Sequence, residues 1–294
     1  MRININEVKI SQLIIKIWGE LVMKKNMLKK VLAIAIVGVM GFGGVSCGNG
    51  DKTKDIDLLS KIKEKGELIV GLNADYAPYE FHILENGQDK IVGFDIDIAE
   101  EIAKDMGVKL VIKDMEFDSL LTALTGNKLD LIISGMSPTE KRKKTVDFSD
   151  IYYVAEHGMV VRAEDKDKYK TFSDLNGQKV GAQMGSIQEG LAKDNIENVD
   201  LQLLSNVTEL LVSLKAGKIE ALVVELPVAE MIVQNNEELA VAEGKIKDES
   251  GGSAIAIKKD SQELVAQVNE TIKRIIDEKL LDQFIIDAND LAGK

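Results

Sequence analysis

Short apolar runs alternate with amphipathic segments from about residue 68 to the C-terminus. A helix expected over residues 94–106 places Ile98, Ile102 and Met106 on one face, and Gly107 ends it. Because buried strands joined by helices form parallel sheets, this alternation predicts an α/β fold with a mostly parallel sheet. The other predicted strands are 68–72, 108–112, 129–134, 157–162, 178–183, 200–204, 219–224 and 254–258, and the other predicted helices are 120–124, 186–193, 207–216, 227–235 and 261–288.

One helix–strand pattern occurs twice, ninety residues apart. Residues 121–134 align without a gap on residues 211–224, and a proline, Pro138 or Pro227, follows each copy. Two such units predict two lobes of similar construction, unless the likeness is a chance one between short amphipathic segments. Ligands bind beyond the carboxyl ends of strands in open α/β sheets, so the loops at 135–137 and 225–226 are expected to face one cleft.

The residues after the two repeated strands carry opposite charges. Thr139 can cap a short helix with Arg142 one turn into it, and free backbone N–H groups beside a forked cation form a carboxylate site. Glu225 directly follows a buried strand and needs a cationic partner. A zwitterion would suit both groups. Arg142 could instead be a solvated member of the basic run 141–144, and Glu225 could be a helix cap ahead of Pro227.

The composition excludes several kinds of site. Among 294 residues there are one cysteine and two histidines, His82 and His157. These numbers exclude an internal disulfide framework and a metal site built from Cys or His, and we expect neither a metal nor another cofactor. The formal charge of −12 argues against a protein that follows nucleic-acid phosphates.

The N-terminal region is typical of an export signal. Lysines within residues 24–30 precede the apolar run 31–42, which is too short for a permanent membrane span, and small residues follow it. The segment Gly44-Val45-Ser46-Cys47 resembles a bacterial lipobox, although an aliphatic residue is usual where Gly44 stands. We therefore expect lipidation of Cys47; the alternative is an incidental cysteine.

These features divide the N-terminal region into three parts. Residues 1–22 fit no signal pattern, so we expect that translation begins at Met23. Residues 23–46 would then be the lipoprotein signal peptide. The polar residues 47–59 read as a flexible tether to the folded part.

Several motifs in the body occur in an order that resembles a known family. They are Gly71-x-x-x-Asp75-Tyr76-x-Pro78-Tyr79-Glu80-Phe81, Val92-Gly93-Phe94-Asp95-Ile96-Asp97-Ile98-Ala99, Phe117-Asp118-x-Leu120-x-x-Ala123-Leu124, Thr139-Glu140-Lys141-Arg142 and Val146-Asp147-Phe148-Ser149-Asp150-x-Tyr152-Tyr153. From about residue 60 onward the chain is similar to the polar amino-acid-binding receptors of ATP-driven importers, family 3 of the bacterial extracellular solute-binding proteins.

The resemblance implies a two-lobed, hinged fold of the periplasmic-binding-protein-like type II class. Lobe 1 would comprise residues 60–153 and 253–294, and lobe 2 residues 154–252. Two crossings, near 153–156 and 249–253, would form the hinge. Gly251 and Gly252 support the second crossing physically, because glycine tolerates large backbone changes.

The resemblance also implies how the two ends of an amino acid would be held. Arg142 would bind the α-carboxylate, together with Ser137 and the backbone at Gly135. Glu225 would bind the α-ammonium group, where many relatives carry Asp.

Further residues are implied for the rest of the ligand. Tyr76 and Phe117 would sandwich its side chain, although by themselves these aromatic residues favour ordinary core packing. Gln183 and Ser186 would belong to a helix N-terminus that completes the carboxylate site from lobe 2. Asn73 stands where cation-binding relatives often carry Asp, and it is less suited to a basic head group. Because Asp75 and Glu116 lie close by in sequence and could take that role, the substrate is expected to be a polar or basic amino acid.

The implied function is capture of that amino acid by hinged closure and its delivery to a membrane permease with a cytoplasmic ATPase. Ligand would favour the closed form because lobe 2 contacts it only there. The protein would be a monomer without enzymatic activity, anchored by lipid on the outer face of the cytoplasmic membrane. Two alternatives stay open: a dehydratase-like enzyme on the same fold, although the sequence has no Ser–His–Asp set or phosphate loop, and a sensory amino-acid receptor.

Overall fold

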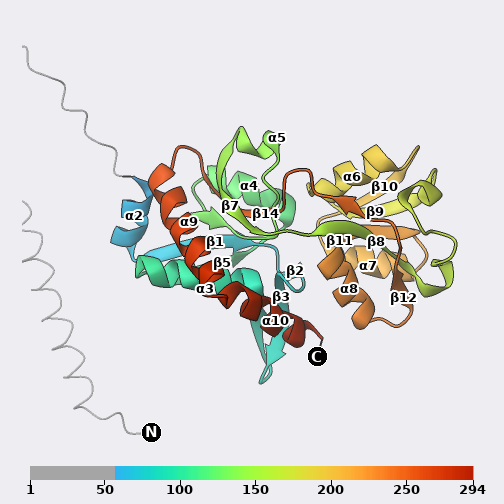
Figure 1. Cartoon of the computed structure of the whole chain (residues 1–294), viewed down its shortest axis with the longest axis horizontal. Helices are drawn as coiled ribbons and strands as arrows, with labels where there is room; N and C mark the ends of the chain where they lie inside the picture. The colour runs from blue at the N-terminus through green and yellow to red at the C-terminus, as the bar shows by residue number, and fades with distance from the viewer. Residues whose placement is uncertain (1–56, 294) are drawn as a thin grey trace, which may run out of the picture. The chain divides into compact units, whose positions relative to one another are not determined.

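The computed structural model describes residues 57–293, which belong to one compact unit, Asp55–Lys294. The predicted start at Met23, the signal peptide 23–46, Cys47 and most of the tether lie outside the described residues. Within the described part, two sheets with helices on both faces lie side by side (Figure 1).

The first sheet has the strand order β5-β1-β6-β14-β7. Strands β5, β1 and β6 are parallel, whereas β14 is antiparallel to both β6 and β7. Helices α2, α3 and α9 pack into the core on one face, and α4 covers the other. The bounds are α2 (Leu58–Lys65), β1 (Glu67–Leu72), α3 (Phe94–Met106), β5 (Lys109–Asp114), α4 (Phe117–Thr125), β6 (Leu131–Ile132), β7 (Val146–Tyr153), β14 (Ser253–Lys258) and α9 (Gln262–Asp277).

The second sheet has the order β10-β9-β11-β8-β12, with β13 also paired to β8. Strand β9 is parallel to β10 and β11, and β8 is antiparallel to its neighbours. Helix α6 covers one face, and α7 and α8 cover the other. The bounds are β8 (Glu156–Arg162), β9 (Lys179–Gln183), α6 (Ile187–Asn195), β10 (Asp200–Leu204), α7 (Val207–Lys215), β11 (Ala221–Glu225), α8 (Leu226–Gln234), β12 (Leu239–Val241) and β13 (Ile246–Lys247).

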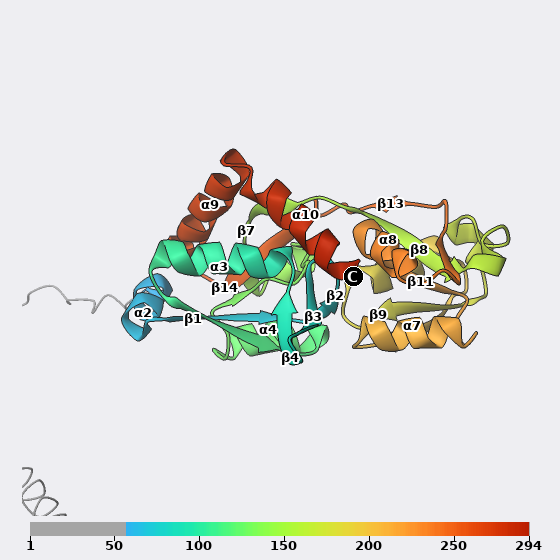
Figure 2. The ribbon, with the colours of Figure 1, turned by 90° about the horizontal axis from the view of Figure 1, so that it is seen from below.

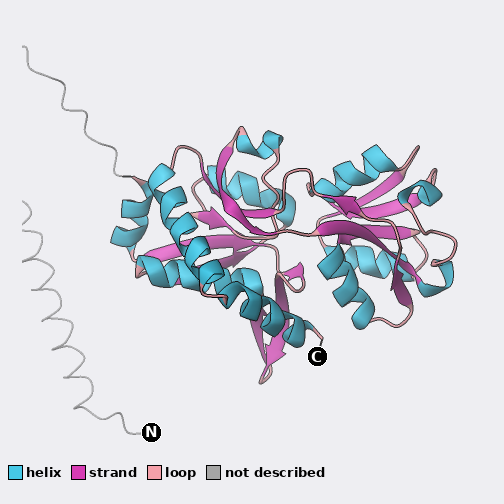
Figure 3. Ribbon diagram, in the orientation of Figure 1, coloured by secondary structure: helices cyan, strands magenta, loops and turns pink. Residues whose placement is uncertain are grey.

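The α/β alternation is confirmed, and so is the repeated helix–strand pattern. Helices α4 and α7 begin and end ninety residues apart, and each leads into a central strand, β6 or β11. The sheets are less parallel than predicted. The chain passes from the first sheet to the second between β7 and β8 and returns between β13 and β14, and these connecting strands run against their neighbours (Figure 3).

The predicted single helix over 261–288 is wrong. Helix α9 ends at Asp277 and α10 (Leu280–Ala292) begins after Lys279, whose φ of 59° is left-handed. Neither Gly nor Pro marks this break in the sequence. The break turns α10 along α3 and toward the second sheet (Figure 2), where the Asn235 side chain donates a hydrogen bond to the Ala292 carbonyl at 2.8 Å.

The alternation pattern also misses a small antiparallel sheet formed by β2 (Asp75–Tyr76), β3 (Glu80–Glu85) and β4 (Gln88–Val92). Asn86 and Gly87 both have positive φ values, 54° and 76°, as a two-residue hairpin turn requires. The Asn-Gly pair was therefore an available signal.

Gly93 joins this small sheet to α3 and thereby positions two acidic residues of the site. Its φ is 130°, and a Cβ there would lie 2.1 Å from the Tyr79 carbonyl oxygen. Glycine alone allows this approach. The N–H of Asp95 consequently reaches the Tyr79 carbonyl at 3.0 Å, which brings the start of α3 beside β3 and Glu80.

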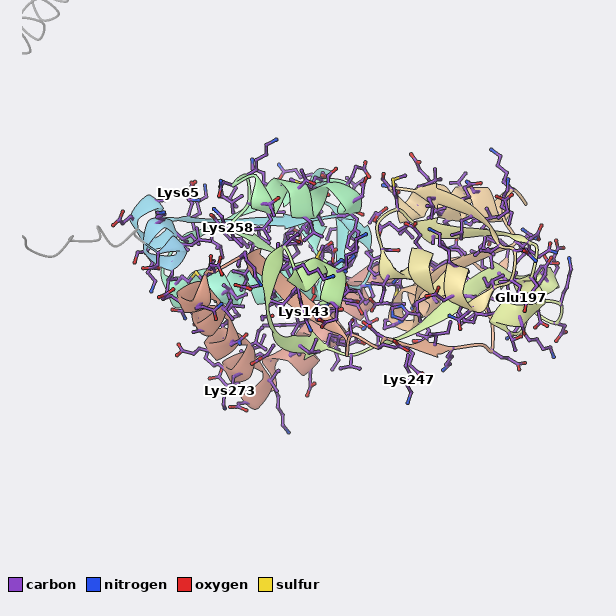
Figure 4. All side chains as sticks on the ribbon, turned by 90° about the horizontal axis from the view of Figure 1, so that it is seen from above. Lys65, Lys143, Glu197, Lys247, Lys258 and Lys273 are labelled. Atoms are coloured by element: carbon purple, nitrogen blue, oxygen red, sulfur yellow. The ribbon has the colours of Figure 1, made fainter. Side chains whose placement is uncertain are left out.

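The surface carries most of the charged side chains, and Lys65, Lys247 and Lys273 extend outward (Figure 4). None of the helices within residues 57–293 combines the length and apolar character that a bilayer span requires.

Candidate functional site

A small cavity lies where the carboxyl ends of strands from both sheets meet. Only about 10 Å³ of it is open to a water-sized sphere, enough for about one water molecule. Of the two loops that were expected to face a cleft, the first contributes Gly135 to the lining, and the second contacts the lining residue Tyr76 through the Glu225 N–H. The lining residues are Asn73, Tyr76, Glu80, Phe117, Ser134, Gly135, Gln183, Ser186 and Gln188.

Arg142 is a buried cation next to this cavity, in contact with the lining residue Phe117, and it lines a larger neighbouring cavity of about 630 Å³. Within residues 57–293 no carboxylate forms an ion pair with it. Thr139 caps the short helix α5 (Glu140–Lys143) by accepting a hydrogen bond from the Arg142 N–H. The guanidinium donates to the carbonyls of Ser137 at 2.8 Å and Gly185 at 3.0 Å, and lies 5.5 Å from the centre of the Phe117 ring. Burial lowers the pKa of Arg142 to about 10, so the side chain is still charged at neutral pH.

Glu225 lies at the end of β11, next to the cavity residue Tyr76, and is only 3% exposed. The Tyr79 hydroxyl donates to its carboxylate, and the Glu225 N–H donates to the Tyr76 hydroxyl at 3.1 Å. Burial raises the pKa of Glu225 to about 8, and the nearby charges of Asp248 and Asp95 add to that rise. No cation pairs with this carboxylate within residues 57–293, so the group is suited to an incoming ammonium.

Glu80 is a second buried acid at the cavity, with no exposed surface. The Ser134 hydroxyl donates to its Oε1, whereas Oε2 has no partner among the described residues. Burial, and next the charge of Asp95, raise the pKa of Glu80 well above its usual range. The site therefore combines one buried cation with two buried acids.

Polar side chains join the two sheets across the cavity. The Gln183 side chain donates to Asn73 Oδ1 at 2.7 Å, and the Gln188 side chain donates to the Tyr76 hydroxyl at 3.3 Å. Asp75 accepts a bond from the N–H of Val207, at the start of α7, at 2.6 Å. In this form the two halves of the site contact each other directly.

Three predicted residues lie at the site with their polar groups already engaged. The Ser137 hydroxyl donates to Asp248 at 2.8 Å, and the Gly135 N–H donates to Asp95 at 2.9 Å. The Ser186 hydroxyl donates to the Gln183 carbonyl at 2.7 Å. Contact with a ligand through these groups would require an exchange of partners.

Sequence reasoning missed several residues of the site. Glu80 belongs to a motif that was recognised, and Gln188 lies two residues after the predicted Ser186, but nothing local marked either as a cavity residue. Ser134 and Asp248 carried no such signal. The described residues contain no group of three or more His, Cys, Asp or Glu side chains arranged to hold a metal ion.

Comparison with known proteins identifies the family. Residues 68–285 match the bacterial extracellular solute-binding proteins, family 3. The protein belongs to this family. The predicted family is thereby confirmed, and membership places this solute-binding protein outside the cytoplasm.

Relatives of the solute-binding protein agree over nearly their full length. The arginine-binding extracellular protein ArtP of Bacillus subtilis is 36% identical over 259 residues, 87% of this chain and 96% of that relative. The L-arginine-bound crystal structure of AbpA from Streptococcus pneumoniae has a TM-score of 0.78 at 41% identity, and the match covers 80% of this chain and 99% of that one. These similarities confirm the predicted two-lobed type II fold.

One similar structure bears on the enzyme alternative. It is the ancestral amino-acid-binding protein AncCDT-1, described as a precursor of cyclohexadienyl dehydratase. It is 33% identical to this chain with a TM-score of 0.70, and the match covers 79% of this chain and 98% of that one.

Proposed function

We propose that this solute-binding protein captures arginine for an amino-acid ABC importer. Import through such a transporter is the function that its family and its relatives share. The finer proposal is that Arg142 binds the α-carboxylate, Glu225 the α-ammonium group and Glu80 the guanidinium.

The observation that supports this proposal is a set of three buried ionisable side chains that line one cavity or lie next to it. Arg142, Glu225 and Glu80 each lack an ionic partner among the described residues. Buried ionised groups are tolerated when they are paired with an opposite charge. A ligand with one anionic group, for Arg142, and two cationic groups, for the two acids, would pair all three. Arginine has this pattern, whereas a neutral amino acid would leave one acid unpaired.

The remaining lining residues suit the same ligand. Tyr76 and Phe117 provide aromatic faces, which attract a cation such as a guanidinium. Asn73 and Gln183, hydrogen-bonded to each other in this form, would supply neutral polar contacts. Ser137, Gly135 and Ser186 would assist Arg142 at the carboxylate. Relatives that are named for arginine support this choice.

We further propose that ligand enters by hinged opening of the two lobes, 60–153 with 253–294 and 154–252. The closed cavity admits only about one water molecule, so the contacts between the lobes must separate before an amino acid can enter. Residues 154–155 and 248–252 connect the sheets, and Gly251 and Gly252 have φ values of 95° and 130°.

Hinged closure predicts a change in shape. Arginine should lower the radius of gyration measured by small-angle X-ray scattering, because it favours the form in which both lobes contact it. The Arg142→Ala variant at the same arginine concentration is the control and should stay in its ligand-free form. Identical scattering curves with and without saturating arginine would rule out the proposed movement.

Calorimetric titration tests the choice of ligand. We expect arginine to bind one-to-one and at least about tenfold more tightly than citrulline, which has the same shape with a neutral head group. Equal affinities would show that Glu80 does not recognise a guanidinium. Chromatography of the mixture after prolonged incubation separates receptor from enzyme: a receptor returns arginine unchanged, whereas any product would favour the dehydratase-like alternative.

We also propose that a lipid on Cys47 anchors the mature protein, as a monomer, at the outer face of the cytoplasmic membrane. The lipobox-like segment supports the anchor. Mass spectrometry of the protein extracted from membranes should find the mature N-terminus at Cys47 with an acyl modification, and an unmodified thiol there would contradict the anchor.

A further inference from the structure

Two buried carboxyl groups face each other beside the cavity. Glu80 comes from β3 and Asp95 from the first turn of α3, and neither has exposed surface. Their side chains lie within hydrogen-bonding reach of each other. Glu80 lines the cavity, and Asp95 accepts a hydrogen bond from the lining residue Gly135.

In each of the two carboxyl groups, one oxygen accepts hydrogen bonds from neighbouring donors and the other does not. Ser134 donates to Glu80 Oε1, while the Gly135 N–H and the Tyr152 hydroxyl donate to Asp95 Oδ2 at 2.9 and 3.0 Å. The other oxygens, Glu80 Oε2 and Asp95 Oδ1, are buried without any donor among the described residues. Two buried acceptors without donors are costly, and one proton between them would satisfy both.

We propose that Glu80 and Asp95 share one proton in the ligand-free protein, and that a cationic ligand head group releases it by pairing with Glu80. The inference rests on the proposed function, because it assigns the guanidinium to Glu80. The step is balanced: the protonated carboxyl of Glu80 loses its proton to solvent, and the resulting carboxylate pairs with the cation. Asp95 is a positioning residue that acts through Glu80.

The electrostatics favour a proton on Glu80 rather than on Asp95. Asp95 accepts two other hydrogen bonds, which stabilise its charged form, whereas Glu80 accepts one. Two adjacent buried carboxylates cannot both ionise without a large repulsion. Burial raises the pKa of Asp95 to about 6 and the pKa of Glu80 well above its usual range.

Among residues 57–293, no cationic group close to the pair relieves this repulsion. The titratable groups that influence the pair are Asp75 from β2, Tyr152 from β7 and Glu225 at the end of β11, and none of them is cationic. The neighbouring tyrosines, Tyr76 and Tyr152, have pKa values raised well above their usual range by burial and stay neutral. The arriving guanidinium would therefore be the first cation beside the pair.

The proposal predicts a proton count that depends on the head group of the ligand. Titration in buffers of different ionisation enthalpy should show that arginine releases about one proton more than citrulline near neutral pH. The comparison cancels any proton that Glu225 releases to solvent when it pairs with the α-ammonium group, because both ligands carry that group. At pH values below the pKa of the pair, the ratio of arginine affinity to citrulline affinity should increase as the pH increases, by up to about tenfold per pH unit. Equal proton counts for the two ligands would overturn the inference.

Asp95→Asn tests the positioning role. An asparagine amide can donate to Glu80 Oε2 in place of the shared proton, so Glu80 would be ionised before ligand arrives. The additional proton released by arginine should fall to about zero, and the pH dependence of the affinity ratio should flatten, while arginine still binds. A variant that keeps the extra proton release would contradict the role of Asp95.

A measurement without ligand separates this inference from the choice of arginine. The infrared spectrum of the ligand-free protein at neutral pH should contain a protonated-carboxyl band that Glu80→Gln removes. If arginine fails to bind, the proposed substrate is wrong, and this band still decides whether the proton is there. A spectrum unchanged by Glu80→Gln would overturn the shared proton whichever ligand is bound.

Discussion

Arg142→Ala should weaken arginine binding by about 2 to 5 kcal/mol, roughly thirty- to several-thousandfold, because the α-carboxylate loses its buried cationic partner. None of the described residues that line the small cavity is a cation that could replace this charge. The Arg142 guanidinium contacts the Phe117 ring and the Gly185 carbonyl from the second sheet. Calorimetric titration with arginine measures the loss directly.

Two control variants separate loss of charge from loss of structure. Lys143→Ala removes a cation from the same short helix, but Lys143 is exposed and pairs with Glu140, so its affinity should stay within about twofold of the native protein. Arg142→Lys keeps the charge without the fork and should fall between the two. Native affinity in Arg142→Ala would show that the carboxylate is bound elsewhere.

Glu225→Gln should have opposite effects on binding and on stability. It should weaken arginine binding at least about thirtyfold, because the α-ammonium group loses its buried counter-charge. The ligand-free protein should be as stable as the native protein or more stable, since a buried carboxyl without a cationic partner is replaced by a neutral group of the same size. Calorimetry and thermal unfolding measure the two effects.

The stability gain should depend on pH in a defined direction. In the native protein the pKa of Glu225 is raised to about 8, so its folded form holds a proton that the unfolded chain releases above the usual range near 4.5. The stabilisation that protonated Glu225 gives the native protein is fully present below about pH 4.5 and is lost as the pH rises through about 8. The advantage of Glu225→Gln should therefore be larger at pH 8 than at pH 4.5. Glu230→Gln, an exposed change on α8, should show neither effect.

Local sequence patterns predicted much of the fold. Helix α3 has the bounds predicted from its apolar spacing and from Gly107, which is left-handed at φ 71°. The ninety-residue repeat correctly indicated two similar helix–strand units. The break at Lys279 was not predictable in this way, because α9 and α10 are both amphipathic and only the packing of α10 along α3 requires a bend between them.

Local patterns also identified the principal charges of the site. Arg142 and Glu225 follow strand ends, and parallel strands bring their carboxyl ends together, so residue type and position in the chain were sufficient to select them. Their partners were not visible. Tyr79 and Glu225 are 146 residues apart, and Ser137 and Asp248 are 111 residues apart. Such contacts depend on how the two sheets meet.

The sequence by itself determined the family, the α/β class and the charged residues at the two strand ends, because each depends on short-range order along the chain. Only the tertiary structure decided which of those charges are buried and unpaired, and that Glu80 joins Asp95 beside the cavity. The physical reason is that the cost of a buried charge depends on every neighbour that removes water or donates a hydrogen bond. Here those neighbours come from β3, α3, β7 and the loop after β6.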